Sequence, residues 1–292
     1  MMISTIYIKK GGMKTDINIG LSGSKLKILP GNIIRKYCPD LGFADRFKIQ
    51  IDKQVLFHSK SANKQSLFTP YIIKHTSTHF DMQYISGESY QDYFSKCTKE
   101  DLDSLYCIYT DYIKNLISNS ESYINSDEIQ IKLITKLKNL KSSSKYIDYI
   151  QFLKNKVKST QFSKVSKTDY HGDFSVANMI FFKSKVCCID FLDSYIDTGI
   201  VDLVKLQQDL KYGWVLDNNT SNLRIRQSFK YLWDKLYLEF KNYYDLELTK
   251  IITILNWLRI EPYISTNKQK LILDKFITNS QYYEEFNNSN SR

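Results

Sequence analysis

The run His-Gly-Asp-Phe-Ser-Val-Ala-Asn at residues 171–178, with Val-Cys-Cys-Ile-Asp-Phe at residues 186–191, is the most informative stretch of this 292-residue chain. It places Asp173, Asn178 and Asp190 close together in the sequence. Phosphoryl transfer needs a carboxylate that orients and deprotonates a hydroxyl, and oxygen ligands for Mg²⁺ on the phosphates. The three side chains can supply these groups in that order, so the stretch predicts a kinase-type site.

Each of these residues also has an ordinary structural role. Asp173 could cap a helix, Asn178 could fill a turn and Asp190 could end a strand. For a single residue these structural roles are as good an explanation as a catalytic one. The joint spacing of the three residues favours the kinase-type site.

The composition indicates a globular protein, because 42% of the residues are hydrophobic and 14% are aromatic. We expect no membrane span, and Lys9 and Lys10 follow the apolar start too early for a secretory signal, so we expect a cytoplasmic protein. The five cysteines follow no zinc or disulfide spacing. Cys187 and Cys188 are expected to pack on opposite sides of a strand.

The formal net charge of +10 comes from dispersed lysines, without a run of five or six basic residues. No nucleic-acid-binding module is recognisable, so we expect no nucleic-acid partner. The surface should attract anions mildly.

Residues 1–85 look rich in strands, and a Pro-Gly-Asn turn at 30–32 indicates a hairpin. Apolar residues at helical spacing predict one helix over residues 43–59. The expected strands cover residues 3–8, 17–21, 25–29, 33–37, 70–73 and 79–85.

Residues 86–89 break the strand pattern, so we place a domain boundary there, with residues 86–292 forming a larger, mostly helical lobe. The polar tail at residues 284–292 is expected to fray. The fold class is therefore α+β. The expected helices cover residues 102–117, 129–140, 146–157, 202–210, 223–244, 248–258 and 271–276.

These motifs resemble the aminoglycoside phosphotransferase and choline kinase family, small-molecule kinases with the two-lobed protein-kinase-like fold. The resemblance is strongest over residues 170–202 and weaker over residues 20–87. It implies ATP and Mg²⁺ as cofactors, Asp173 as the catalytic base, and Asn178 and Asp190 as the Mg²⁺ ligands.

The resemblance also implies that His171 supports the catalytic loop through hydrogen bonds rather than touching phosphate. Asp202 resembles a carboxylate that braces this loop, although capping of a helix explains it equally well.

Gly20, Ser22, Gly23 and Ser24, followed by Leu26 in a strand, resemble the family's phosphate-covering loop. Small residues there let backbone N–H groups approach phosphate oxygens. A plain hairpin turn has the same composition. The segment lacks the Gly-Lys-Ser/Thr ending of a P-loop, which disfavours that class of nucleotide-binding protein.

Strand alternation puts Ile34 and Lys36 on one face, so Lys36 can reach the phosphates if Ile34 faces the base, and Arg35 then points to solvent. An exposed lysine on an edge strand is the alternative. A kinase lysine needs a partner from the next helix. Asp52 is the candidate and Gln54 the substitute.

Met82, Gln83 and Ile85 resemble the hinge between the lobes, where adenine bonds to the backbone of Gln83 and Ile85. An ordinary buried strand is the alternative.

The resulting hypothesis is a kinase that phosphorylates a hydroxyl of a small metabolite, such as a sugar, an amino alcohol or a surface-polysaccharide precursor. The segment from Asp190 to Asp202 is too short to dock a peptide, which disfavours a protein kinase. An inactive nucleotide-binding module is disfavoured, because it has no chemical reason to keep Asp173, Asn178 and Asp190 together with Lys36. An aminoglycoside acceptor suits a +10 chain poorly, so a neutral or anionic sugar-like acceptor fits better. Its expected wall contains Tyr212, Trp214, Asp217, Trp257, Arg259, Glu261 and Tyr263. For each aromatic residue taken alone, a place in the core is the commoner alternative.

Overall fold

A computed structural model describes residues 16–18, 24–38, 41–61, 66–118, 122–140, 144–216, 223–264 and 266–290. The strand expected at residues 3–8 lies outside these ranges. The same holds for Gly20, Ser22, Gly23 and Asp217.

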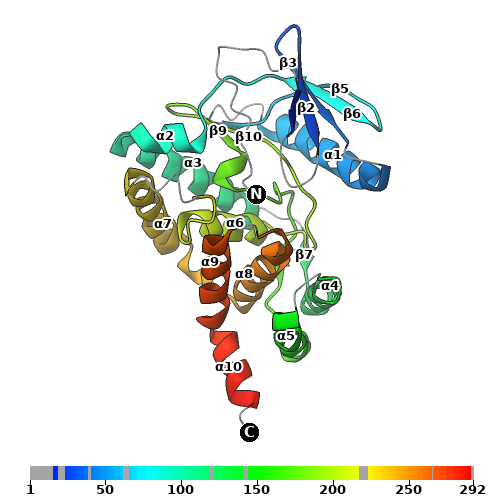
Figure 1. Cartoon of the computed structure of the whole chain (residues 1–292), viewed down its shortest axis with the longest axis vertical. Coiled ribbons are helices and arrows are strands. Elements are labelled where there is room, and N and C mark those ends of the chain that lie inside the picture. Colours follow the sequence, from blue (N-terminus) through cyan, green and yellow to red (C-terminus); the bar gives the residue numbers. More distant parts are fainter. Residues whose placement is uncertain are drawn as a thin grey trace.

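The N-terminal lobe is an antiparallel sheet with one helix against it, as expected (Figure 1). Alternating side chains on the strands explain its core, because one face of the sheet packs on helix α1 (Ala44–Ser61) around Phe47 and Ile51. The strands, in spatial order, are β1 (Asp16–Asn18), β2 (Lys25–Leu29), β3 (Ile33–Tyr37), β6 (His79–Gln83) and β5 (Ile72–His75).

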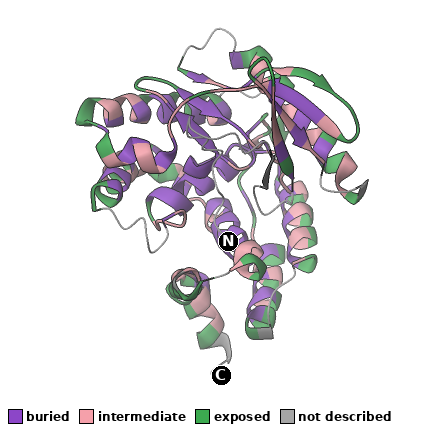
Figure 2. Cartoon of the chain, turned by 45° about the horizontal axis from the view of Figure 1, so that its top comes forward, coloured by how far each residue is buried: buried purple, intermediate pink, exposed green. Residues whose placement is uncertain are grey.

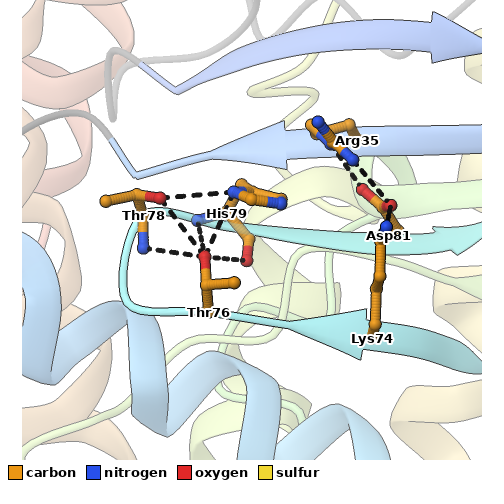
Figure 3. A network of polar contacts seen from close by, with 6 residues as sticks. All are labelled: Arg35, Lys74, Thr76, Thr78, His79 and Asp81. Carbon is orange, nitrogen blue, oxygen red and sulfur yellow. Dashed lines mark hydrogen bonds and ion pairs between the residues drawn. The ribbon is translucent and has the colours of Figure 1, made fainter.

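The opposite face of this sheet carries a polar ladder across β3, β6 and β5 (Figure 3). Arg35 Nε lies 2.7 Å from Asp81 Oδ1, and Lys74 Nζ lies 3.5 Å from Asp81 Oδ2. The hydrogen bond from Arg35 holds the pKa of the buried Asp81 carboxyl below its usual range. The expectation that Arg35 points freely to solvent is therefore wrong, since register places Asp81 directly opposite it.

The C-terminal lobe is mostly helical, which confirms the α+β fold class. Its helix α6 is buried at every residue, and it packs against α7 and α8 in the middle of the molecule (Figures 1 and 2). The helices are α2 (Tyr90–Lys96), α3 (Lys99–Ser118), α4 (Ser126–Lys138), α5 (Ile147–Ser159), α6 (Ile200–Leu210), α7 (Leu223–Tyr244), α8 (Glu247–Ile260), α9 (Asn267–Thr278) and α10 (Gln281–Asn290).

Two of these helices were not among the expected ones. Helix α2 begins directly after the predicted break at residues 86–89, and the Ser89 hydroxyl caps it by accepting the backbone N–H of Asp92 at 3.1 Å. The tail expected to fray forms α10, because Tyr282 is buried and Phe286 packs on the ring of Tyr149. Aromatic anchors therefore order a largely polar segment.

A small sheet lies between the two lobes. In it, β10 (Val186–Cys188) pairs antiparallel with β9 (Met179–Phe181) and parallel with β4 (Leu67–Phe68). Cys187 and Cys188 are fully buried in different apolar clusters, which confirms that they pack on opposite sides of a strand. A further short pair joins β7 (Tyr123–Ile124) to β8 (Val165–Ser166).

Helix α1 also contacts the C-terminal lobe. Lys53 Nζ donates to the Leu192 carbonyl at 2.8 Å and lies 3.7 Å from the centre of the Tyr170 ring. The ring of Phe57 packs on Phe191 with 5.1 Å between centres. One helix thus belongs to the cores of both lobes.

No helix in the described part of the chain is both long and apolar enough to cross a membrane.

Candidate active site

His171 lies at the centre of the loop that carries Asp173. Its side chain is fully buried, with Nε2 placed 2.9 Å from the Ile189 carbonyl and Nδ1 3.2 Å from the backbone N–H of Asp173. Burial lowers the pKa of His171, so the ring is neutral, with Nε2 donating and Nδ1 accepting. These contacts agree with the supporting role expected for His171.

Gly172 allows the loop to turn tightly. Its φ of +86° lies in the left-handed region, and a Cβ atom at this position would collide with the carbonyl oxygen of Leu192. Leu192 is held there because its backbone N–H donates to His171 at 2.9 Å. Only glycine fits this crossing of two backbones.

Asp202, in the first turn of α6, braces the same loop. Its carboxylate accepts the backbone N–H of His171 at 2.7 Å and of Gly172 at 2.8 Å, and also the Tyr112 hydroxyl at 2.7 Å. Gly199 is the N-cap of this helix. The geometry therefore decides between the two interpretations of Asp202 in favour of bracing.

Asp173 is held from two sides. Its Oδ1 lies 2.8 Å from Lys205 Nζ, and its Oδ2 accepts the side-chain amide of Asn178 at 2.8 Å. Burial favours the protonated carboxyl, but Lys205 and the more distant Arg259 outweigh burial and hold the pKa of Asp173 below its usual range. Asp173 is therefore an ionised carboxylate at neutral pH, as a proton acceptor must be.

Lys205 and Asp209 are site residues that the sequence analysis missed. Both lie on the face of α6 that carries Asp202, and Asp209 accepts the backbone N–H of Val176 at 2.8 Å. Burial raises the pKa of Asp209 from 3.8 to about 7. The spacing of positions 202, 205 and 209 along one helical face was the available signal.

Asn178 and Asp190 emerge side by side. The N–H of Ile189 donates to the Asn178 carbonyl at 3.0 Å, which brings Asp190 next to Asn178. Asp190 has a φ of +62°, a strained conformation that turns its side chain out of the strand direction. Its side chain is 38% exposed.

These two residues fit a magnesium ion. The Asn178 amide nitrogen is directed at Asp173, so the amide oxygen is the group left for a metal, and Asp190 contributes a carboxylate. One or two protein oxygens suffice, since Mg²⁺ keeps several waters or phosphate oxygens in its octahedral shell.

Lys36 is buried and points toward the same place. Its Nζ lies 2.7 Å from Asp190 Oδ1 and 3.4 Å from the Gln50 side-chain oxygen. The prediction that Asp52 is the partner of Lys36 is wrong, because Asp52 lies on the exposed face of α1 and pairs with Lys48 at 2.6 Å. Two residues along a helix point to nearly opposite sides, so Gln50 and Asp52 cannot both face the sheet.

Gln54, the substitute partner, is also not the partner of Lys36. Its side-chain amide donates to the Pro70 carbonyl at 2.8 Å and to the Met82 sulfur at 3.7 Å. It therefore fixes the helix to the end of the sheet.

The remaining expected nucleotide-binding residues lie around the sheet. Leu26, Ile34 and Met82 are buried in the cluster against α1, and Ser24 is buried at the start of β2. Their contact with a nucleotide stays a prediction.

The residues of the expected hinge run from the end of β6 to an apolar cluster of the small sheet. The backbone N–H of Gln83 donates to the Tyr71 carbonyl at 3.1 Å, so this N–H is already bonded. Ile85 packs against the cluster of Ile180, Cys187 and Ile189. Ile189, which precedes Asp190, therefore packs in the same apolar cluster as Ile85, in the segment that joins the lobes.

One residue of the expected acceptor wall, Trp257, belongs to the core, whereas Tyr212, Trp214, Arg259 and Glu261 are partly buried and Tyr263 is exposed. Trp257 is buried, and its ring meets Tyr212 and Trp214 edge to face, with centres 5.6 and 5.3 Å apart. Aromatic packing holds these three side chains, and their contact with an acceptor stays a prediction.

Two basic side chains, Lys205 and Arg259, act on Asp173. Arg259 acts on the pKa of Asp173, as stated above, and it is also near Lys136 of α4. Burial lowers the pKa of Lys136, and the like charges of Arg259 and Arg46 add to this effect. Lys136 Nζ lies 5.7 Å from the centre of the Tyr195 ring, in the loop that follows Asp190.

Comparison with known proteins gives a consistent picture of the fold. No protein-family model matches the chain, and no curated protein matches it. Among solved structures, the complex of APH(2")-IIia with GDP and kanamycin matches with a TM-score of 0.55 at 13% identity, over 92% of this chain and 95% of that one.

Two further structures match over similar lengths. Amicoumacin kinase hAmiN in complex with AMP-PNP, Ca²⁺ and Ami gives a TM-score of 0.52 at 13% identity, covering 93% of this chain and 92% of that one. Macrolide 2'-phosphotransferase type I gives 0.51 at 10% identity, covering 91% of each chain. The expected fold is confirmed: the chain has the two-lobed fold of these kinases and phosphotransferases.

Proposed function

We propose that this chain is a phosphotransferase that moves the γ-phosphoryl group of ATP to a hydroxyl of a small metabolite. One observation carries the proposal. Lys36 contacts Asp190, Asp190 lies beside Asn178, and Asn178 contacts Asp173, so all groups that phosphoryl transfer needs form one continuous row. In this assignment residues 1–85 cover the nucleotide and residues 86–292 hold the reacting groups.

Asp173 acts on the acceptor. Its carboxylate is ionised and fixed by Lys205 and Asn178, so it can align a hydroxyl and take its proton as the phosphoryl group moves. Lys205 also places a positive charge beside the position where negative charge develops.

Lys36, Asn178 and Asp190 act on the nucleotide. Asn178 and Asp190 would hold Mg²⁺, which when bound neutralises charge on the phosphate oxygens. Lys36 is only weakly bonded to Gln50, and its partner Asp190 is partly exposed, so Lys36 can exchange this contact for a phosphate oxygen.

The acceptor is best described by its charge. Lys205 contacts Asp173, and Arg259 is near enough to lower the pKa of Asp173. Two positive charges beside the reacting carboxylate disfavour a polycation and tolerate a neutral or anionic molecule. We therefore assign a sugar-like acceptor that is neutral or carries a phosphate or carboxylate group.

The test is transfer of labelled phosphate from ATP, with Mg²⁺, to a panel of neutral sugars, sugar phosphates, uronic acids, amino alcohols and aminoglycosides. We expect product with a neutral or anionic member and at least a hundredfold less with Asp173→Asn. Asp169→Asn is the matched control, because Asp169 is exposed and pairs with Lys60 away from this row. Equal turnover by Asp173→Asn, or no transfer and no ATP hydrolysis with any member, would overturn the proposal.

A further inference from the structure

A cavity of about 550 Å³ lies among α6, α7, α8, α9 and the start of α10. Figure 1 shows α6 in the middle of the molecule and α9 and α10 in the half away from the N-terminal sheet. The size of the cavity suits a small organic molecule. Its lining includes Gln207, Lys211, Tyr244, Lys250, Lys275 and Phe276.

The cavity lies behind the candidate active site, on the other side of two shared helices. On α6, Lys205 contacts Asp173, whereas Gln207 lines the cavity. On α8, Arg259 is near Asp173, whereas Lys250 lines the cavity. Side chains two or nine positions apart on a helix point about 160° to 180° apart. A molecule in the cavity would therefore not touch Asp173.

The charges of the cavity are all of one sign. Lys211, Lys250 and Lys275 line it, and the described lining residues include no aspartate or glutamate. Lys250 is 4.0 Å from Glu247, a weak pairing at the edge of the cavity. Lys211 is an exposed residue whose pKa is lowered by partial desolvation of its ammonium group.

Aromatic rings line the cavity, and one lining residue carries a buried hydroxyl without a hydrogen-bond partner among the described residues. Lys211 Nζ lies 5.0 Å from the centre of the Tyr212 ring, and Tyr212 and Phe276 both line the cavity. Tyr244 lines it too, and its buried hydroxyl has no hydrogen-bond partner among the described residues. An unpaired buried hydroxyl is destabilising, and a polar ligand atom that reached it would relieve this cost.

We propose that this cavity binds a small organic anion, with a phosphate or carboxylate group attached to a ring or an apolar body. Lys211 and Lys275 contact the anionic group, the aromatic side chains contact the ring, and the Tyr244 hydroxyl donates to an oxygen. The proposal goes beyond the phosphotransferase activity and does not depend on it.

The experiment is isothermal titration of the full chain with phenyl phosphate at low salt, with an ATP analogue and Mg²⁺ present in excess to fill a nucleotide site. Phenol and inorganic phosphate each carry half of the probe, and benzoate replaces phosphate by carboxylate. We expect phenyl phosphate to bind more tightly than phenol or phosphate alone. The ratio of phenyl phosphate to benzoate affinity then identifies the preferred anionic group.

Variants place the binding in the cavity. Lys211→Met should weaken binding by about tenfold, as expected for loss of a charge-assisted contact. Lys275→Met, at an exposed position that tolerates change, should weaken it less, and Tyr244→Phe by a few fold. Lys241→Met removes a charge from exposed α7 surface outside the cavity and should leave the affinity unchanged.

Three results would overturn the proposal. The first is absence of binding to phenyl phosphate or benzoate at millimolar concentration. The second is binding that disappears once the ATP analogue is present. The third is equal weakening by Lys211→Met and Lys241→Met, which indicates attraction to the basic surface as a whole.

Discussion

Two lysine–aspartate pairs lie in the candidate active site, and their lengths are nearly the same. Lys36 meets Asp190 at 2.7 Å, and Lys205 meets Asp173 at 2.8 Å. Their surroundings differ, because the Asp190 side chain is 38% exposed and the Asp173 side chain only 14%.

The difference indicates two separate tasks. Asp173 is enclosed, has the Asn178 amide as a further partner, and has its pKa lowered, so its charge and position are fixed. Asp190 has a strained backbone and an open side. A fixed carboxylate suits proton transfer, whereas an accessible one suits an exchangeable ligand such as a metal ion. Pair distance alone does not reveal this.

The largest expected effect is the loss of the enclosed carboxylate. Asp173→Asn should lower kcat by about 10²–10⁴-fold, the usual contribution of a positioned general base. The KM for ATP should change little, since Asp173 faces the acceptor. Steady-state kinetics measures both values. A large rise in KM for ATP with unchanged kcat would contradict the assignment.

The exposed carboxylate should show a different defect. Asp190→Asn is expected to lower the rate by about a hundredfold and to raise the Mg²⁺ concentration needed for half-maximal activity, because a charged oxygen ligand is lost. A titration with Mg²⁺ measures this. If Asp173→Asn shifted the Mg²⁺ requirement as strongly as Asp190→Asn, the division of tasks would be wrong.

Removal of the enclosed lysine should change the pH profile. Lys205 holds the pKa of Asp173 low, so Lys205→Met raises this pKa and protonates Asp173 at a higher pH. The acid limb of the kcat profile should move to higher pH, with about a tenfold loss in rate. Lys211→Met, at the C-cap of α6 and about 120° around the helix axis from Lys205, is the control and should leave the profile in place.

Asp209 extends the comparison to a buried carboxylate without a lysine contact. Its folded-state pKa of about 7 exceeds its ordinary value of 3.8, so the folded protein holds this proton more tightly than the unfolded chain. The resulting stabilisation is full below about pH 4 and is lost as the pH rises toward 7. Because asparagine does not titrate, Asp209→Asn should remove this pH-dependent loss of folding stability.

Urea unfolding of both proteins at pH 5 and pH 8 measures the effect. The free energy of unfolding of Asp209→Asn, relative to the original protein, should rise between the two pH values. A constant difference would mean that Asp209 does not titrate in this range.

The smallest effects concern the helix beside Lys36. Gln50→Ala removes the 3.4 Å contact with Lys36 and should raise the KM for ATP by a few fold. Asp52→Ala, on the exposed face, should leave all kinetic constants unchanged. If Asp52→Ala alone impaired ATP use, Asp52 would be the functional partner after all.

The features that could be predicted from the sequence are those that depend on residues close together in the chain. The lobed fold and the loop from His171 to Asn178 follow from local patterns, and the structure places Asp173, Asn178 and Lys36 together as expected. Lys205 and Asp209 were missed, because an isolated lysine or aspartate on a helix usually faces solvent and only tertiary packing buries these two.

The errors have physical reasons as well. Asp52 was chosen by residue type, but the phase of α1 turns it outward and turns Gln50 inward. The acceptor wall around Trp257 stays a prediction: the rings of Tyr212, Trp214 and Trp257 pack on one another, and Tyr212 also lines the cavity described above. A pattern of residue types does not say which side of a helix is covered by the rest of the chain.

The anchoring of α1 bears on how the proposed phosphotransferase would be regulated. In protein kinases, the position of the corresponding helix is a point of control. Here Lys53 and Phe57 attach α1 to the segment that follows Asp190, and β4, at the end of the same connection, is paired with β10. The helix cannot swing outward without unpacking both lobes. We expect an enzyme without an off state of this kind, in which hydrogen exchange of α1 is the same with and without nucleotide.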